Sequence, residues 1–373
     1  MLKNPFVTSG YEGPEFFCDR EEETKKLTQL LANGNNVVMM SPRRMGKTGL
    51  LYHAFQQKEV SKNYNTFIID IYSTKNMTEM VAEMGKVILN VLQSKGERAF
   101  RKFVKTVSSL RPNMSLDPVG NMSWNVEVGT LQNPDYTLEQ IFQYIEKSDR
   151  PCLVAIDEFQ QVSYYPEKNV EAILRTYIQT CRNANFVFSG SERHLLTEMF
   201  FSPARPFYAS TSTMSLGSID VEKYAAFAKA HFENAKKHLA DGVMETIYNR
   251  FEGVTWYIQK VLNFLFTDTA LGETCGVDMI DKAVNEIVSD NSSIYADLLY
   301  QLTAKQKELL LAINKEGKAT SIMGSKFVKK YHLTAASSIQ TTIKSLMERQ
   351  LVTKHLDVYE VYDKFFSLWL KTL

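Results

Sequence analysis

The chain has 373 residues, which is enough for two or three domains at roughly 150 residues each. Hydrophobic residues make up 44% and charged residues 23%, which are the proportions of a globular protein and argue against a disordered or fibrous chain. The formal net charge of +1 argues against a protein that coats nucleic acid through its overall charge, although it is compatible with a local basic surface.

The N-terminus and the cysteines further limit the class of protein to which the chain can belong. Residues 1–5 are not followed by the apolar stretch that a secretory signal needs, and no apolar run approaches the roughly 20 residues that span a bilayer. We therefore expect a soluble cytoplasmic protein without a membrane partner. The four cysteines are widely spaced and form no C-x-x-C pair, so we expect buried thiols rather than a zinc cage or a disulfide framework.

The first predicted elements are a helix, a strand and a second helix. Asp19 followed by Glu22 has the spacing of a capping box, which predicts a helix over about residues 20–33. Residues 36–40 form a short apolar run that predicts a buried strand. Another helical pattern begins at Lys47, so the chain passes from strand to loop to helix.

The loop between this strand and helix has the sequence SPRRMGKT. In a phosphate-binding loop, backbone N–H groups and a helix N-terminus converge on anionic oxygens, a lysine neutralises charge and a hydroxyl binds Mg²⁺. Gly46, Lys47 and Thr48 keep that pattern, whereas Ser41 replaces the usual first glycine. The tripeptide alone is weak because it arises by chance, but its place between strand and helix strengthens it. The residues predicted to bind nucleotide here are Ser41, Pro42, Arg43, Arg44, Met45, Gly46, Lys47, Thr48 and Gly49.

The rest of the first half alternates strands with helices. Such alternation predicts an α/β domain with a mainly parallel sheet over residues 1–220. Residues 95–135 are basic at first and rich in Pro, Gly and Asn later, which predicts an insertion that contains a small hairpin. The predicted strands cover residues 66–72, 152–156, 185–188 and 213–219, and the predicted helices cover residues 77–93 and 169–182.

The strand at residues 152–156 ends in the acidic pair Asp157 and Glu158. Ligands bind at the carboxyl ends of parallel strands, so the pair lies where a metal-bound phosphate would be. Because adjacent strand residues point in opposite directions, one carboxylate could hold Mg²⁺ while the other polarises an attacking water. The alternative is a solvated acidic turn, which does not account for the GKT about 110 residues upstream.

The second half of the chain is mostly helical. Residues 221–291 show helical patterns, and the segment from Leu302 onward predicts three helices followed by two short β-rich pieces, which suggests a winged helix. That segment has 12 Lys or Arg against 6 Asp or Glu. The face that would read DNA comprises Ser337, Ser338, Gln340, Thr341 and Lys344.

These segments resemble P-loop ATPases of the AAA+ and STAND type, and in particular the prokaryotic family of archaeal and Bacteroides-type ATPases. FFCDREEE is similar to the family's N-terminal signature, SPRRMGKT to its Walker A, CLVAIDEFQ to its Walker B and FVFSGSERHLL to its sensor 1 strand. IQTTIKSLMERQLV and YEVYDKFFSLWL resemble its winged-helix ending. The resemblance covers nearly the entire chain and implies an α/β, parallel-sheet P-loop NTPase core over residues 1–220, a helical lid over 221–295 and a winged-helix domain over 296–373.

The resemblance implies a role for each matching residue. Lys47 would contact the β and γ phosphates, Thr48 and Asp157 would serve Mg²⁺, and Glu158 would activate water. The sensor of the γ phosphate would be one of two serines. These serines are Ser189 and Ser191.

Some positions depart from the family's pattern or are open to another interpretation. Phe17 and Arg20 would contact adenine, but Cys18 and Asp19 stand where the family has a small residue and a glycine. The lid motif has Thr255 and Trp256 where proline is expected. The candidates for a transition-state arginine are Arg193 and Arg205, for which the alternative is an ordinary surface arginine.

Two roles are open for the winged helix. It could bind the DNA major groove, or it could pack on the ATPase core as a regulatory domain with a solvated basic surface. We favour the second role slightly, because half a dozen excess charges support only modest phosphate affinity and Lys344 is the one cation of the reading face. The aromatic cluster near the C-terminus, Phe365, Phe366, Leu368, Trp369 and Leu370, is predicted to be domain core.

We therefore predict a cytoplasmic ATPase that binds ATP and Mg²⁺, hydrolyses ATP slowly and works as a switch coupled to its winged helix. The alternative is a DNA-binding regulator in which ATP is only a structural ligand. A small-molecule phosphotransferase is the third possibility, but no segment forms an obvious acceptor pocket. The expected partners are ATP or ADP, and DNA or a protein at the winged helix, while the oligomeric state stays open.

Overall fold

A computed structural model describes residues 3–110, 112–116, 122–126, 131, 133–333 and 336–373. The chain folds as two compact units. One unit comprises residues 5–227 and 253–259, and the other comprises residues 228–252 and 260–373 with the short N-terminal piece before Pro5. The predicted division into core, lid and winged-helix domains stays a prediction.

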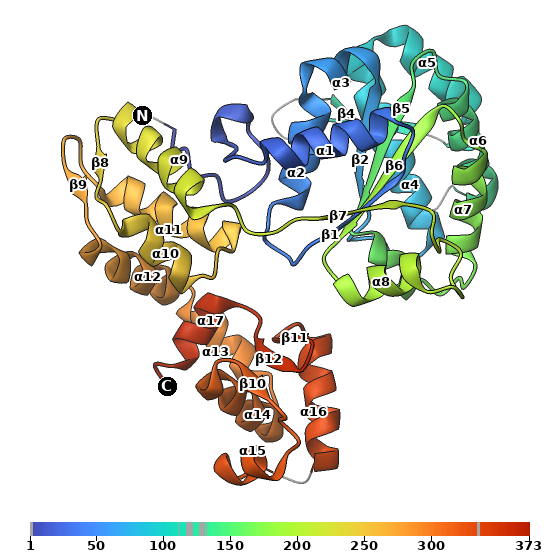
Figure 1. The fold of residues 1–373 in the computed structure, drawn as a ribbon. Coiled ribbons are helices and arrows are strands. Elements are labelled where there is room, and N and C mark those ends of the chain that lie inside the picture. Colours follow the sequence, from blue (N-terminus) through green and yellow to red (C-terminus); the bar gives the residue numbers. More distant parts are fainter. Residues whose placement is uncertain (1–2, 111, 117–121, 127–130, 132, 334–335) are drawn as a thin grey trace. The chain divides into compact units, whose positions relative to one another are not determined.

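A five-stranded sheet forms the centre of the first unit (Figure 1). Its strands follow the order β2-β5-β6-β1-β7 and all neighbouring strands are parallel, which confirms the predicted α/β fold. The last strand ends at Ser215, earlier than predicted, because Met40 opposite it is the last residue of the strand with which it pairs. The strands are β1 (Val37–Met40), β2 (Asn65–Asp70), β5 (Cys152–Asp157), β6 (Ala184–Gly190) and β7 (Ser212–Ser215).

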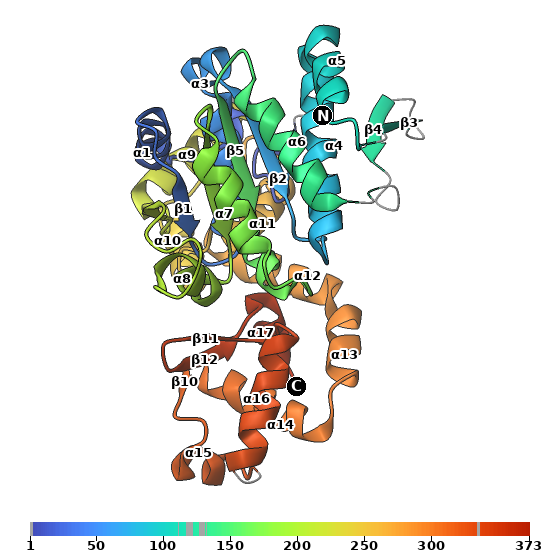
Figure 2. The same ribbon diagram turned by 90° about the vertical axis from the view of Figure 1, so that its right-hand side faces the viewer.

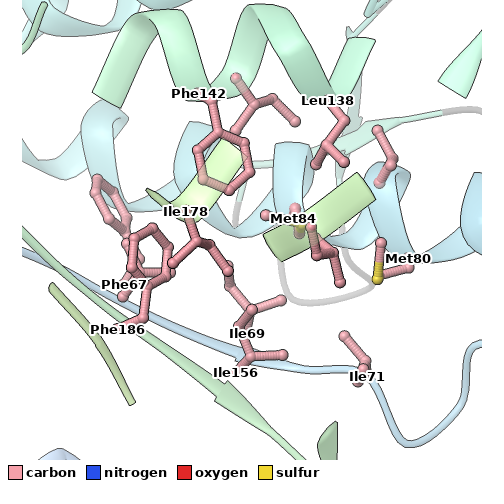
Figure 3. Packing of buried hydrophobic residues seen from close by; sticks show 14 of the residues in the cluster. Phe67, Ile69, Ile71, Met80, Met84, Leu138, Phe142, Ile156, Ile178 and Phe186 are labelled. Carbon is pink, nitrogen blue, oxygen red and sulfur yellow. The ribbon is translucent and has the colours of Figure 1, made fainter. Parts of the chain in front are cut away.

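Two hydrophobic cores cover the two faces of this sheet. Along β5, Leu153 and Ala155 belong to one core, whereas Val154 and Ile156 belong to the other. Because successive strand residues point to opposite faces, β5 is buried on both sides and its sequence is continuously apolar. The first core lies beneath α1 (Glu21–Ala32) and α2 (Lys47–Gln56). The second lies beneath α4 (Met77–Lys95), α6 (Pro134–Glu146) and α7 (Val170–Thr180), and Figure 3 shows part of it.

The start of α1 differs from the predicted capping box. Its N-cap residue is Arg20, not Asp19, and no side chain caps the helix. Both residues have positive φ angles, 50° at Asp19 and 68° at Arg20. This turn carries the Asp19 carboxylate away from the helix N-terminus to an ion pair with Lys223 at 3.0 Å. The capping prediction was wrong because Asp19 pairs with Lys223 instead of capping the helix, and the same turn buries the Arg20 side chain.

The predicted insertion contains one helix and one strand pair. The basic stretch lies in α5 (Glu97–Thr106), which packs against α4. Strands β3 (Pro112–Leu116) and β4 (Met122–Val126) pair antiparallel, as the predicted hairpin requires, and Figure 2 shows β4 beside α4. The residues that join these two strands lie outside the described part of the chain.

The second unit begins with helices and ends in the predicted winged helix. Its three-stranded sheet has the order β10-β12-β11. The sequence predicted β11 and β12 but not β10. The helices and strands are α9 (Val221–Asn234), which begins in the first unit, β8 (His238–Leu239), α10 (Val243–Arg250), α11 (Thr255–Asp268), which also begins in the first unit, β9 (Thr274–Cys275), α12 (Asp278–Asp290), α13 (Ser292–Tyr300), α14 (Ala304–Glu316), β10 (Ala319–Thr320), α15 (Ser325–Lys330), α16 (Ala336–Glu348), β11 (Val352–His355), β12 (Val358–Val361) and α17 (Lys364–Leu370).

Four residues of the predicted C-terminal cluster, Phe365, Phe366, Trp369 and Leu370, are core, as predicted, and Leu368 is half-buried. Phe365 and Phe366 are buried in α17, and Trp369 donates its indole N–H to the Ser292 hydroxyl at 2.9 Å. The Phe365 ring also contacts Phe251 at the end of α10, with ring centroids 5.3 Å apart. The last helix therefore joins the winged helix to the helices that precede it within this unit.

Two simpler expectations concern membranes and thiols. Within the part of the chain that the structure describes, no helix is both long and apolar enough to cross a membrane. All four cysteines are buried free thiols, as predicted.

A cluster of four phenylalanines, Phe159, Phe188, Phe200 and Phe207, holds the segment after β5 against α8 (Arg193–Phe201), with ring centroids 4.7 to 5.7 Å apart. Replacing Phe200 with Ala should lower the free energy of unfolding by about 3–5 kcal/mol, because it leaves a cavity in a packed core. Urea denaturation of the full chain measures the change.

The neighbouring residue Phe201 provides the matched control, because it is on the same helix and its side chain is 43% exposed. Phe201→Ala should change the free energy of unfolding by less than about 0.5 kcal/mol. Equal losses in the two variants would contradict a specific role of the cluster.

Candidate functional site

The predicted phosphate-binding loop lies between β1 and α2, at the carboxyl end of the sheet (Figure 1). Gly46 is the N-cap residue of α2 and has a φ of 89°, a conformation that favours glycine. Arg44 also has a positive φ, of 67°. The loop therefore turns sharply before α2 and presents the N-terminus of that helix, with its unpaired N–H groups, to the sheet edge.

Lys47 is the first residue of α2 and is buried. Its ammonium group donates hydrogen bonds to the carbonyl oxygens of Ser41 and Pro42, both at 2.9 Å. Burial lowers the pKa of Lys47 to about 8, although the negative charges of Glu158 and Asp157 act in the opposite direction. A bound anion would favour the charged form of this lysine.

Asp157 joins the loop to the sheet. Its Oδ2 accepts a hydrogen bond from the Thr48 hydroxyl at 2.6 Å, and its Oδ1 accepts one from the Ser189 hydroxyl at 2.6 Å. The structure thus brings together Thr48 and Asp157, which lie 109 positions apart in the chain. A hydroxyl and a carboxylate oxygen are ligands that suit a hard cation such as Mg²⁺, so the pair fits the predicted metal role.

Glu158 follows Asp157 but does not continue the strand. Its φ of 56° places it in the left-handed region, so strand alternation does not determine its direction, contrary to our expectation. Its Oε2 accepts hydrogen bonds from the Ser191 hydroxyl, at 2.8 Å, and from the side-chain amide of Gln160. The Ser191 hydroxyl also accepts a hydrogen bond from Arg43 Nε at 2.9 Å. The two candidate sensor serines are thereby distinguished, because Ser189 contacts Asp157 and Ser191 contacts Glu158.

A cavity of about 290 Å³ opens at these residues, entirely within the first unit. Its lining includes Arg43–Gly49 of the phosphate loop and Glu158 on one side. On another side it is lined by Val7–Gly13 and Phe16–Cys18 of the N-terminal segment. The predicted loop and Glu158 therefore border one space, together with a segment that can form a second wall.

Aromatic side chains form part of that second wall. Phe17 stacks on the His53 ring with centroids 4.4 Å apart and planes at 19°. Tyr11 meets the Phe17 ring edge-on and its hydroxyl lies 2.9 Å from Nδ1 of His53. A Cβ at Gly49 would lie 3.2 Å from the Phe17 ring, so the glycine lets Phe17 pack closely against α2. Sequence patterns pointed to Phe17 but not to Tyr11 or His53, which are distant in the chain and follow no motif.

The Arg20 side chain supports the phosphate loop through hydrogen bonds. Its side chain is 3% exposed, and its guanidinium donates to the carbonyl oxygens of Met45 at 3.3 Å and Gly217 at 2.7 Å. It also pairs with the Glu23 carboxylate at 2.7 Å. Arg20 lines the cavity, as predicted for a nucleotide-binding residue, but these donors are engaged with the protein itself.

Arg44 ties the loop to the start of α11. Its guanidinium carbon lies 4.3 Å from the ring centre of Trp256 and 4.9 Å from that of Tyr257. The Arg44 carbonyl accepts a hydrogen bond from the Trp256 backbone N–H at 3.0 Å, and the indole N–H donates to the Thr8 carbonyl at 3.0 Å. Trp256, which stands where the family motif predicted proline, therefore contacts the phosphate loop directly. No sequence pattern indicated this contact.

The predicted transition-state arginines lie elsewhere. Arg205 pairs with Glu171 on α7 and with Glu198 on α8, the latter at 3.4 Å. Arg193 begins α8 and is exposed. Among the described residues that line the cavity, Arg43 is present but neither Arg193 nor Arg205 is.

The predicted DNA-reading face lies on α16 of the second unit. Ser337, Gln340, Thr341 and Lys344 are exposed there, and Ser338 is half-buried. Several lysines of the winged helix have acidic partners. Those ion pairs are Lys330–Glu316 at 2.6 Å, Lys344–Glu348 at 3.9 Å, Lys354–Asp357 at 3.6 Å and Lys318–Glu252 at 2.7 Å, and Lys364 also pairs with Glu252.

Comparison with known proteins assigns both parts of the chain. Residues 17–261 match the family described as the ATPase domain predominantly from Archaea, and residues 293–372 match a probable winged helix domain. No protein with a curated description matches the chain.

Several solved structures share the fold over nearly the whole chain. A Walker-type ATPase of Pyrococcus abyssi has a TM-score of 0.66 and 16% identity, with 98% of this chain and 99% of that chain covered. The ORC2 protein of Aeropyrum pernix, solved as ADPNP-ADP complexes, has a TM-score of 0.60 and 14% identity, with 99% and 98% covered. The ORC1 protein of the same organism, solved with DNA, has a TM-score of 0.56 and 11% identity, with 99% and 96% covered. These similarities concern the fold.

Lys47 should make phosphate binding depend on pH. Because a bound polyphosphate favours the charged ammonium and the pKa of Lys47 is lowered to about 8, affinity for ATP should be full below that pH and fall above it. The loss should approach roughly tenfold per pH unit between about pH 8 and 10. Calorimetric titration with ATP across that range measures it.

Lys47→Arg is the control, because a guanidinium stays protonated over this range. Its affinity for ATP should change little with pH, even if it is weaker than that of the wild type. An affinity of the wild-type chain that is constant from pH 7.5 to 9.5 would contradict the lowered pKa.

Proposed function

We propose that this chain, which belongs to the family of ATPase domains that come predominantly from Archaea, binds Mg-ATP and hydrolyses it slowly as a molecular switch. The observation that carries the proposal is the 2.6 Å contact between the Thr48 hydroxyl and the Asp157 carboxylate. A phosphate-binding loop and an acidic strand end can bind one nucleotide together only if they are adjacent. The contact between Thr48 and Asp157 supports such a joint site. Chance occurrence of either motif gives no reason for them to be adjacent.

The loop would bind the phosphates. Backbone N–H groups around Gly46 and the N-terminus of α2 would face the phosphate oxygens, and Lys47 would neutralise the β and γ phosphates. To do so, its ammonium would exchange the carbonyl oxygens of Ser41 and Pro42 for phosphate oxygens. Thr48 and Asp157 would hold Mg²⁺, which would supply charge neutralisation on the β and γ phosphates.

Glu158 would act as the general base. It lines the same cavity as Lys47, and it is distinct from the carboxylate that contacts Thr48. Ser189 would report on the metal through Asp157, and Ser191 is better placed to act on Glu158, which it contacts at 2.8 Å. For the transition-state charge, Arg43 is supported over Arg205, because Arg43 lines the cavity and Arg205 is engaged with Glu171 and Glu198.

The aromatic wall would take the adenine. Phe17 and Tyr11 line the cavity beside the loop, and the His53 ring stacks on Phe17 without being part of that lining. Burial lowers the pKa of His53, which favours its neutral ring. Arg20 would contribute by supporting the loop at Met45 rather than through free donors, because Glu23 and Gly217 already bind its guanidinium.

For the winged helix we propose a regulatory role rather than DNA recognition. Glu252, which follows α10, pairs with Lys318 and Lys364 of the winged helix. Together with the acidic partners of the other lysines, these contacts consume much of the positive charge that phosphate binding would need. The alternative, a DNA-binding regulator in which ATP is only structural, would need that charge free.

Two substitutions separate binding from hydrolysis. Lys47→Ala should abolish measurable ATP binding, because it removes the cation at the phosphates. Glu158→Gln should retain ATP affinity within about threefold while phosphate release falls by roughly 100-fold or more, because only the base is lost. Calorimetry with ATP and a phosphate-release assay measure the two quantities.

Glu192→Gln is the matched control for the second variant, because Glu192 is a glutamate that does not line the cavity and that binds the Tyr164 hydroxyl at 2.8 Å. It should keep both affinity and turnover. Unchanged ATP affinity in Lys47→Ala would overturn the nucleotide site, and sustained phosphate release by Glu158→Gln would remove Glu158 from its role.

Duplex DNA discriminates between the two roles of the winged helix. In the regulatory role, DNA should leave the rate of phosphate release unchanged within about twofold, and any binding should disappear above about 0.15 M salt. Phosphate release with and without DNA, and fluorescence anisotropy of a labelled duplex, test this on the full chain. Submicromolar binding at physiological salt that Lys344→Glu abolishes would instead support the DNA-binding alternative.

A further inference from the structure

Gln160 has no role in the site described so far, although it contacts Glu158. It lies two residues beyond Glu158 in the short helical turn η3 (Phe159–Tyr164), and its side-chain amide donates to Oε2 of the Glu158 carboxylate. We propose that Gln160 is a positioning residue that fixes the orientation of the general base. The inference rests on the proposed hydrolysis of ATP and names a residue that serves it.

The hydrogen bonds of Glu158 fall on one of its two carboxylate oxygens. Among the described residues, both side chains that donate to this carboxylate, Gln160 and Ser191, bind Oε2. With Oε2 anchored twice, rotation of the carboxylate is restricted and Oε1 is the oxygen presented to a water. A base that is already oriented does not have to be ordered in the transition state.

The backbone of Glu158 makes such anchoring useful. Its φ of 56° places a residue that is not glycine in the left-handed region, directly after the end of β5. Strand geometry therefore does not direct its side chain, and contacts have to do so. Gln160 provides one from within the same turn.

The position of Gln160 is itself fixed by the sheet. Its side chain is 1% exposed, and a Cβ at Gly190, the last residue of β6, would lie 2.0 Å from Gln160 Oε1. Any side chain at position 190 would displace the amide, so a glycine there leaves room for Gln160. The neighbouring strand thus holds the amide where it reaches Glu158.

The chemical step defines what this orientation would achieve. A water oxygen forms a bond to the γ phosphorus while the bond from that phosphorus to the ADP oxygen breaks, and one water proton passes to Oε1 of Glu158. The proton is later released, so that ATP and water give ADP and phosphate. A hydrogen bond that keeps Oε1 directed at the water speeds this step without taking part in ATP binding, so its loss should lower the rate of phosphate release and leave KM for ATP unchanged.

Ser191 also donates to Oε2, and because its hydroxyl accepts from Arg43 it links Glu158 to the phosphate loop, whereas the Gln160 amide contacts Glu158 from within the same turn. Other charged groups around Glu158 are Asp157 and Asp70 at the strand ends and Arg43 and Lys47 from the loop. A substitution at Gln160 leaves all of them in place. A loss of turnover without a change in KM after that substitution therefore reports on Glu158.

Gln160→Met tests the role, because methionine has a similar length and shape but cannot donate. On the full chain, the rate of phosphate release at saturating ATP should fall about tenfold at neutral pH, while KM for ATP should change by less than about twofold.

Gln161→Met is the matched control, because it is the same residue type one position further and its amide donates to the Thr74 carbonyl at 3.0 Å. It should keep the wild-type rate and KM. Gly190→Ala is the second test, since it displaces the amide without removing it, and it should lower the rate of phosphate release at saturating ATP with little change in KM, as Gln160→Met does.

The outcomes separate this inference from the proposed function. A folded Gln160→Met variant with the wild-type rate of phosphate release would overturn the positioning role, as would an equal loss of rate in Gln161→Met. If Gln160→Met does not fold, an unchanged rate in Gly190→Ala would overturn it. A wild-type chain that binds ATP but releases no phosphate at any pH would end the proposed hydrolysis itself, and this role with it.

Discussion

The buried carboxylate of Asp157 is the interaction on which the rest of the site depends. It is 2% exposed, and a carboxylate so far from water is stable only if hydrogen-bond donors surround it. The donors are the Thr48 hydroxyl at the start of α2, the Ser189 hydroxyl at the end of β6 and the backbone N–H of Glu158. The hydrogen bonds to this one carboxylate fix the phosphate loop, the start of α2 and the ends of β5 and β6 relative to one another.

The charge of the cavity follows from the same arrangement. Its lining holds four basic side chains and two acidic ones. Arg20 donates to the Met45 and Gly217 carbonyl oxygens and Arg44 lies against two aromatic rings, so both hold the loop in shape. Lys47 donates to loop carbonyl oxygens and Arg43 to the Ser191 hydroxyl, and both also line the cavity. The surplus of positive charge in the lining suits a polyphosphate.

The sequence was informative where a pattern reflects backbone geometry. The apolar run of β5 predicted a strand buried on both faces, and the GKT after β1 predicted a turn into a helix, because periodicity and glycine conformation act locally. The sequence was uninformative where a side chain binds a residue that is distant in the chain. Asp19 had the spacing of a helix cap but pairs with Lys223, and Arg205 matched a motif region but pairs with Glu171. Neither partner could be read from nearby residues.

Gly190 shows how a residue can matter through the side chain that it lacks. In the sequence it is simply a glycine at the end of an apolar run, where a turn is the ordinary explanation. In the fold it is the last residue of β6, beside the turn that follows β5, and it leaves space for the Gln160 amide. The order β5-β6 in the sheet is what places the two together. The orientation of Glu158 is therefore a property of the sheet as much as of the turn in which Glu158 lies.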